Sequence, residues 1–290
     1  MNRSKEIFEY LKLPGSARGI ILAPNAPPIS RTPAGIEVAL NLVLDASDIS
    51  DTLEHLYTES APTAGSIAPT GSGTFAFGQK GVGRIRVSYA TQRGSYVLAI
   101  TTIPFDIPQP AEITESPEIV ESLAKIIASD EKVFVAINGP DTFTTDSFVY
   151  SVLQIVNGSS RNVISILQPK LAYLMGHSNS VVMQSELGID TPDLKSGLAN
   201  AAHFNANIIY ISDIEEDDDH PLIRQTIASG NIVILSSVSQ SPAMLSDRYA
   251  APASTVMSRG KTLLQLHYHV YPEMNGKLSI IASQTDQESP

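Results

Sequence analysis

Beyond residue 116 the chain alternates short apolar runs with helical patterns, and this alternation strongly restricts its fold class. Continuous apolar runs, typical of strands buried on both faces, cover residues 133–137, 163–167, 208–211 and 232–235. Helical patterns precede or separate them at residues 117–129, 146–157, 196–204 and 222–229. Strands and helices in this order form a mainly parallel sheet with right-handed crossovers. The sequence therefore predicts an α/β domain over residues 111–290.

The first 110 residues have the pattern of an α+β domain instead. Residues 81–90 and 95–102 alternate apolar and polar side chains, as strands with one covered face do. A run of small residues at 60–73 predicts an exposed loop. Pro104, Pro108 and Pro110 then predict a linker, because proline is excluded from helix interiors. We therefore expect two domains, 1–110 and 111–290.

The composition excludes several classes of function. Cysteine is absent, which excludes disulfides and thiolate metal sites. The formal net charge of -11 argues against nucleic-acid binding, since that affinity comes largely from Lys and Arg on phosphates. No apolar run reaches the ~20 residues of a membrane helix, and the first residues lack the apolar core of a signal peptide. These features predict a cytoplasmic protein with no direct membrane insertion.

Several short motifs follow one another along the chain with a distinctive order and spacing. They are GVGRIRV (81–87), TQRG (91–94), TIP (102–104), Gly139-Pro140, Val156-Asn157, Gln184-Ser-Glu186, Asp190-Thr191, NIIYISD (207–213) and Asp247-Arg248. As an ordered set they resemble the motor ATPases of type IV pilus retraction and type II secretion, from about residue 20 to residue 282. The resemblance implies a PAS-like α+β domain followed by a RecA-like P-loop NTPase domain, assembled as a hexamer at the inner face of the membrane.

The phosphate loop implied by this resemblance is degenerate. A working Walker A loop needs glycines with inward-pointing N–H groups, a Lys for the β/γ-phosphates and a Ser or Thr for Mg²⁺. Here residues 139–146 read GPDTFTTD, with Thr144 at a glycine position, Thr145 at the Lys position and Asp146 at the Mg²⁺ hydroxyl position. We therefore expect only remnants of a nucleotide site, namely Gly139, Pro140, Thr144, Thr145, Asp146 and Asp213.

Other positions where the family carries catalytic groups are also replaced. The carboxylate expected before Pro169 is Gln168, and the histidine expected after the strand at 232–235 is Val238. The arginines expected on the helix at 196–204 are Ala199 and His203. Asp213 retains an acid where the family has Glu.

Three arginines of the family pattern remain in the N-terminal domain, Arg84, Arg86 and Arg93. In the family, such arginines approach the nucleotide of a neighbouring RecA-like domain, so the resemblance implies an inter-subunit contact. Ordinary solubility of a strand face is the alternative, because surface arginines are common.

We expect a catalytically inactive relative that acts as a structural or regulatory subunit of type IV pilus (twitching motility) or type II secretion machinery. It would join a homo- or hetero-oligomeric ring with a motor paralogue, or bind platform proteins, and needs no cofactor or metal. The alternative is a slow, atypical ATPase that uses Asp146 and Asp213 with ATP and Mg²⁺. A third reading is a stand-alone regulatory module that binds another ligand in the inherited pocket.

Two further patterns are weaker candidates for metal sites. The acidic run at 215–220 lacks the spacing of a calcium loop and is typical of a solvated loop. His267 and His269 alternate along a predicted strand without a third ligand, and a C-terminal hairpin that turns at Asn275-Gly276 is the better interpretation.

Overall fold

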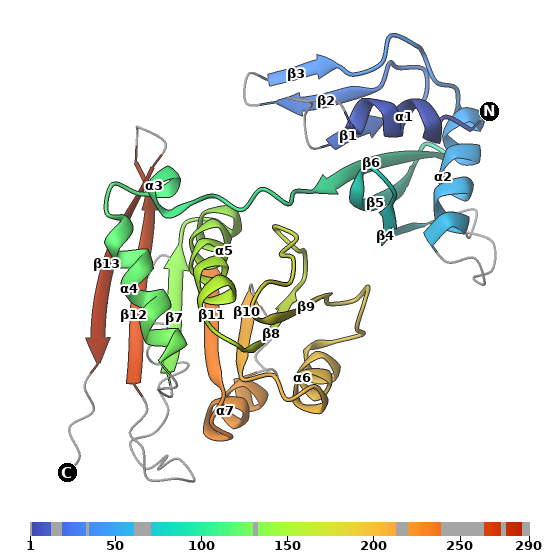
Figure 1. Ribbon diagram of the computed structural model, residues 1–290. Coiled ribbons are helices and arrows are strands. Elements are labelled where there is room, and N and C mark those ends of the chain that lie inside the picture. The colour runs from blue at the N-terminus through green and yellow to red at the C-terminus, as the bar shows by residue number, and fades with distance from the viewer. Residues whose placement is uncertain are drawn as a thin grey trace. The chain divides into compact units, whose positions relative to one another are not determined.

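A computed structural model of the chain describes residues 2–12, 19–32, 35–60, 71–129, 133–212, 220–238, 264–273 and 277–285. It has two compact units, Met1–Pro104 and Phe105–Pro290 (Figure 1). Residues 105–110, which the sequence assigns to the N-terminal domain, belong to the second unit. Pro110 begins the short helix α3 (Pro110–Ile113), where its missing N–H is not needed, and α3 packs on helices of that unit.

The N-terminal unit is a six-stranded antiparallel sheet in the order β3-β2-β1-β6-β5-β4, with two helices on one face. Its elements are α1 (Ser4–Leu11), β1 (Gly19–Leu22), β2 (Ile29–Thr32), β3 (Gly35–Val38), α2 (Ala46–Ser60), β4 (Ser72–Gln79), β5 (Gly83–Gln92) and β6 (Ser95–Ile103). Alternate strand residues such as Ile85 and Ile100 are buried against Ile7 of α1 and Leu53 of α2. The strands predicted at 81–90 and 95–102 are thus confirmed as β5 and β6.

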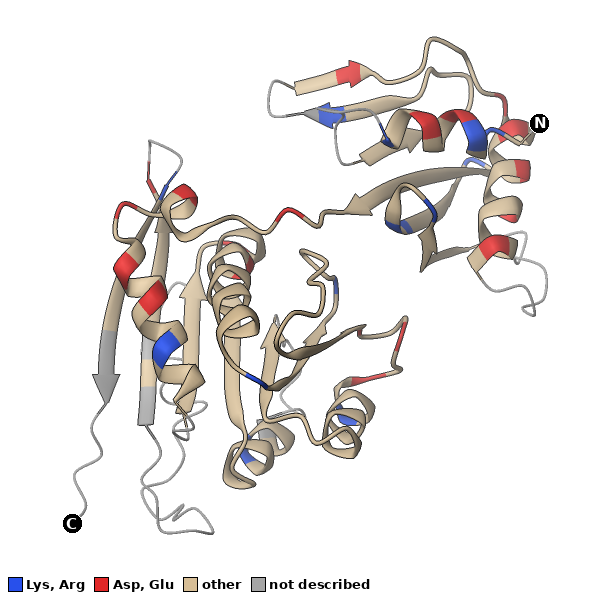
Figure 2. Cartoon of the chain, in the orientation of Figure 1, with Lys and Arg blue, Asp and Glu red and all other residues tan. Residues whose placement is uncertain are grey.

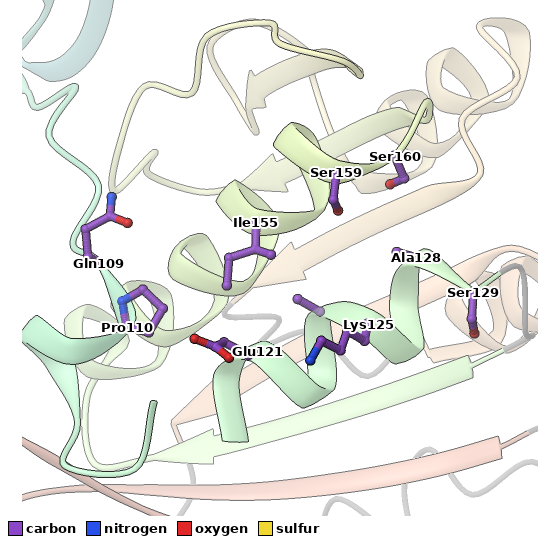
Figure 3. A pocket seen from close by; sticks show the side chains of 10 residues that line it. Gln109, Pro110, Glu121, Lys125, Ala128, Ser129, Ile155, Ser159 and Ser160 are labelled. Atoms are coloured by element: carbon purple, nitrogen blue, oxygen red, sulfur yellow. The ribbon is translucent and has the colours of Figure 1, made fainter. Parts of the chain in front are cut away.

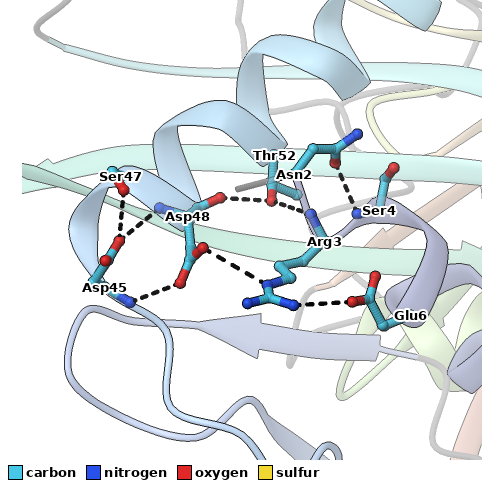
Figure 4. Close-up of polar contacts among 8 residues, drawn as sticks. All are labelled: Asn2, Arg3, Ser4, Glu6, Asp45, Ser47, Asp48 and Thr52. Carbon is cyan, nitrogen blue, oxygen red and sulfur yellow. Dashed lines mark hydrogen bonds and ion pairs between the residues drawn. The ribbon is translucent and has the colours of Figure 1, made fainter.

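Two aspartates cap each other at the start of α2 (Figure 4). Asp45 Oδ1 accepts the backbone N–H of Asp48 at 2.8 Å, and Asp48 Oδ2 accepts the N–H of Asp45 at 3.2 Å. The Ser47 hydroxyl also donates to Asp45 Oδ1, at 2.8 Å. Arg3 then connects α1 to α2. Its side-chain Nε lies 3.7 Å from Asp48 Oδ1, and its backbone N–H donates to Thr52 Oγ1 at 2.9 Å.

Replacing Asp45 with alanine is expected to lower the thermal midpoint of the N-terminal unit by about 3 °C, because α2 loses its N-cap. The N–H of Asp48 and then the Ser47 hydroxyl lower the pKa of Asp45. Because the folded pKa is depressed, this stabilisation is complete above the unfolded pKa of about 3.9 and is lost as the pH falls through the folded value. Thermal melts between pH 2 and 7 measure both effects.

Asn is as good an N-cap as Asp and does not titrate, so Asp45→Asn is the matched control. It should keep the midpoint at neutral pH and weaken the acid dependence. An Asp45→Ala variant that melts like the wild type at pH 7 would contradict the capping role.

The second unit is a seven-stranded sheet in the order β13-β12-β7-β11-β10-β8-β9, parallel apart from the β12–β13 pair. Its strands are β7 (Val133–Gly139), β8 (Val163–Gln168), β9 (Val181–Glu186), β10 (Ile208–Ser212), β11 (Ile232–Val238), β12 (Leu264–Pro272) and β13 (Leu278–Thr285). Its longer helices are α4 (Pro117–Ala128), α5 (Thr142–Ser159), α6 (Leu194–His203) and α7 (His220–Ala228). Helices α6 and α7 cover one face of the sheet, while α4 and α5 pack together and α5 contacts β7, β11 and β12.

The predicted strands at 133–137, 163–167, 208–211 and 232–235 are confirmed as β7, β8, β10 and β11. Strand β9 was not predicted. Helix α4 begins with Pro117 after Ser116 as expected, but the Ser116 side chain makes no capping hydrogen bond. Asp213, most of the acidic run, and the turn at Asn275-Gly276 lie outside the described residues. Among the helices that the structure describes, none combines the length and apolarity needed to cross a bilayer.

Candidate functional site

The turn between β7 and α5 is the site of the expected phosphate loop, and here it is the start of a helix. Helix α5 begins at Thr142, not at the predicted Asp146, because Asp141 is its N-cap. Asp141 Oδ1 accepts the N–H of Thr144 at 2.7 Å, and its Oδ2 accepts the Thr144 hydroxyl at 2.8 Å. The backbone of Asp141 is extended, which places its carboxylate over the first turn of the helix.

The inside of this turn is filled by its own side chains. Thr145 is 1% exposed, and its hydroxyl donates to the carbonyl of Thr142 at 3.0 Å. A Cβ added to Gly139 would lie 2.7 Å from Thr145 Cγ2 and 3.2 Å from the carbonyl oxygen of Val270. The N–H of Thr145 already donates to the carbonyl of Asp141 at 3.3 Å. The amides of Thr144 and Thr145 are thus taken by Asp141.

Positive charge is missing from the elements that form the turn. The sequence contains no Lys or Arg from residue 133 to residue 160, and Figure 2 shows β7 and α5 without a basic residue. Asp141 is exposed, and its carboxylate adds negative charge to this turn. Fixed negative charge in this position repels an anion.

Asp146, the proposed metal ligand, is used inside the protein. It is 2% exposed and accepts a hydrogen bond from the Tyr210 hydroxyl. The same hydroxyl lies 2.8 Å from Ser236 Oγ, so Tyr210 links α5 and β11 through β10. Burial, together with the charge of Asp146, raises the pKa of Tyr210 well above its usual value.

A second tyrosine joins α5 to β8 and β9. Tyr150 donates to Gln168 Oε1 at 2.6 Å, and Gln168 Nε2 donates to Ser212 Oγ at 2.9 Å. Gln184 Nε2 donates to the Tyr150 hydroxyl at 3.1 Å. Burial, followed by the charge of Asp146, raises the pKa of Tyr150 well above its usual value. Gln168, where the family has an acid, is therefore a buried connector between two side chains.

These two sets of hydrogen-bonded side chains meet where the Tyr150 and Tyr210 rings pack edge to face, with ring centroids 6.2 Å apart. We call them together the tyrosine network. Its members are Asp146, Ser147, Tyr150, Gln168, Tyr173, Gln184, Tyr210, Ser212 and Ser236. Sequence reasoning singled out only Asp146 and Gln168 from it as site positions. A signal for Tyr210 did exist, because a tyrosine inside an apolar strand needs a partner for its hydroxyl.

The retained arginines lie in the N-terminal unit. Arg84 and Arg86 are half-buried on β5 and alternate with the buried Ile85 and Val87, so they lie on the face opposite the helices. Arg93 is exposed in the two-residue turn between β5 and β6, with a φ of 50°.

The other expected positions are spread over the second unit. Val238 ends β11, pairs with Gly139 and is 45% exposed. Ala199 and His203 are exposed on α6. His269 stacks on Tyr271 with a ring distance of 5.6 Å, and burial lowers its pKa. Within the described ranges no three His, Asp or Glu side chains gather as a metal site.

A cavity of ≈ 540 Å³ lies elsewhere in the unit, between α4 and α5 (Figure 3). It is lined by charged Glu121 and Lys125, by Ile155, and by the serines at the ends of the two helices. None of the remnants predicted for the nucleotide site lines it. The cavity therefore does not replace the closed turn as a nucleotide site.

Comparison with known proteins gives relatives in one functional group. No model of a known protein family matches the chain. Type IV pilus ATPase PilU of Pseudomonas aeruginosa is 30% identical over 148 residues, which are 50% of this chain and 37% of PilU. The resemblance to the motor ATPases of type IV pili and secretion is thus confirmed, by a match that spans little more than a third of PilU.

Solved structures show the same fold. The pilus retraction motor PilT, crystallised with bound ADP, has a TM-score of 0.75 at 18% identity, over 100% of this chain and 84% of PilT. The ATPase DotB of Legionella pneumophila has a TM-score of 0.67 at 14% identity, over 96% of this chain and 78% of DotB. The fold is therefore the mixed α/β fold of these ATPases.

Proposed function

We propose that this chain, which has the fold of pilus retraction motors, does not hydrolyse nucleotide and is a structural or regulatory subunit of pilus or secretion machinery. The observation that carries the proposal is the closed turn after β7. Asp141 occupies the amide of Thr144, and Thr145 fills the space beside Gly139. A phosphate would need both positions, since backbone N–H groups and a Lys normally hold it there.

The energetic cost of binding a triphosphate supports the same conclusion. A unit negative charge 4 Å from the carboxylate of Asp141 is repelled by about 4 kcal/mol at the effective dielectric of a protein surface. About 1.4 kcal/mol is a factor of ten in affinity, so half of this repulsion would weaken binding more than tenfold. No basic side chain between residues 133 and 160 offsets it.

By analogy with the pilus and secretion ATPases, we extend the proposal to the domains, the assembly and the partners. The second unit is a RecA-like domain with a degenerate P-loop, and the N-terminal unit is PAS-like. The chain works at the cytoplasmic side of the machinery, in a hexameric ring with an active motor paralogue or bound to platform proteins. Arg84, Arg86 and Arg93 contact a neighbouring subunit. A hexamer in light scattering would support the ring, and a monomer would favour the stand-alone regulatory module.

A slow ATPase that uses Asp146 and Asp213 remains the competing candidate, but one observation disfavours it. Asp146 would have to give up the hydrogen bond from Tyr210 and become accessible to Mg²⁺, although it is 2% exposed. Asp213 lies outside the described residues.

Millimolar ATP or ADP with Mg²⁺ is expected to change the thermal midpoint of the protein by less than about 1 °C. A ligand present at 100 times its dissociation constant would add about 2.7 kcal/mol and shift the midpoint by several degrees. Calorimetric titration with the same nucleotides, with and without Mg²⁺, is the matched measurement.

Saturable heat or a concentration-dependent shift would refute the proposal. Turnover of ATP that Asp146→Ala abolishes would establish the competing candidate.

A further inference from the structure

The tyrosine network connects α5 to β8, β9, β10 and β11. In nucleotide-driven proteins the phosphates and their metal order nearby segments, which are released when the ligand is hydrolysed or leaves. We infer that in this chain the network performs that task permanently: it fixes α5 to the carboxyl ends of four strands, so the second unit keeps one conformation without any ligand. This inference rests on the proposed function and adds that the chain enters its assembly as a subunit of constant shape.

The first connection runs from α5 through β10 to β11. Asp146 of α5 accepts from the Tyr210 hydroxyl on β10, and that hydroxyl lies 2.8 Å from Ser236 Oγ on β11. All three side chains are at most 2% exposed. One phenol oxygen thus holds three elements, in an environment where water cannot replace its partners.

The second connection runs from α5 to β8, β9 and back to β10. Tyr150 is fully buried and donates to Gln168 of β8 at 2.6 Å. Gln168 donates to Ser212 of β10 at 2.9 Å, and Gln184 of β9 donates to Tyr150 at 3.1 Å. The amide groups of Gln168 and Gln184 each donate and accept, so each joins a donor to an acceptor, which an ionised carboxylate cannot do.

The segment between β8 and β9 is held by the same side chains. Gln184 Nε2 donates to the carbonyl of Tyr173 at 2.7 Å, and Gln184 Oε1 accepts the N–H of Met175 at 2.7 Å. The Tyr173 hydroxyl lies 2.9 Å from Ser147 Oγ of α5. Because burial and Asp146 raise the pKa of Tyr150 and Tyr210, these hydroxyls keep their protons at neutral and mildly alkaline pH.

Hydrogen–deuterium exchange of the full chain without ligand tests the inference. Tyr210→Phe and Tyr150→Phe remove one oxygen each and keep the ring. We expect amides in the first half of α5 and at the ends of β8 and β10 to exchange about tenfold faster in both variants, the equivalent of about one hydrogen bond. Tyr268→Phe is the control, because its ring packs on Phe148 of α5 at 5.7 Å without belonging to the network. The amide exchange rates of this control should stay within about twofold of those of the wild type.

Two results would overturn the inference. One is unchanged exchange in α5 for both variants, and the other is an equal increase at every amide of the second unit, which any lost buried hydrogen bond could cause. If Tyr210→Phe does not fold, Ser236→Ala breaks the same connection more mildly. Protection of wild-type α5 by MgATP would instead refute the proposed function, so the two failures are distinguishable.

Discussion

Replacing Asn157 with alanine is expected to reduce the free energy of unfolding of the second unit by about 3 kcal/mol. Asn157 is 1% exposed near the end of α5. Its Nδ2 donates to the carbonyl of Gly176 at 2.8 Å, and its Oδ1 accepts the N–H of Ser178 at 3.2 Å. Alanine leaves both backbone groups without this partner and also leaves a small void, which explains the size of the effect.

Urea unfolding followed by circular dichroism measures this loss, because the chain contains no Trp for fluorescence. Asn179→Ala is the matched control in the same segment, since Asn179 is exposed and its side chain bonds to the carbonyl of Gly158 at the surface. It should cost well under about 1 kcal/mol. If the two variants were equally stable, Asn157 would not be the residue that holds this segment.

Gly139→Ala is expected to lower the free energy of unfolding of the second unit by about 2 kcal/mol, the usual size of an overpacking effect. The added methyl group would lie 2.7 Å from Thr145 Cγ2, a stiff β-branched side chain in the first turn of α5. The carbonyl oxygen of Val270 would also lie close to the added methyl group, at 3.2 Å. The variant therefore measures directly how tightly the turn is closed, again by urea unfolding.

The clash can be removed from the other side. Thr145→Ser deletes the Cγ2 methyl and keeps the hydroxyl, so the double variant Gly139→Ala with Thr145→Ser should recover most of the loss. Such a coupling energy between contacting residues is measured by a double-mutant cycle. Additive effects of the two changes would mean that Thr145 does not fill the turn.

The sequence was sufficient to predict the central strands of the second unit, but not its edge strand β9 or the short strands of the N-terminal unit. β7 and β11 are buried along most of their length, so their apolar runs were readable without context. β9 was missed because it carries Gln184 and Glu186, whose side chains face protein partners and not water. β1, β2 and β3 have four residues each, too few for a reliable alternating pattern.

The sequence predicted that the groups which bind nucleotide are missing, but it did not predict which contacts take their place. The missing Lys and glycines could be read from residues 139–146, and so could the glutamine at 168. The contacts that fill this space could not be read from the sequence, because Asp146 and Tyr210 are 64 positions apart and meet only through the sheet register. The start of α5 was readable in principle, because Asp141 precedes Thr144 with the spacing of an N-cap.

The turn at Arg93 does not depend on the arginine side chain. A left-handed backbone, with φ of 50°, suits Asn or Gly better than a long side chain, so nothing in the local geometry calls for arginine. The side chain of Arg93 can therefore be replaced by Asn or Gly without loss of the turn between β5 and β6.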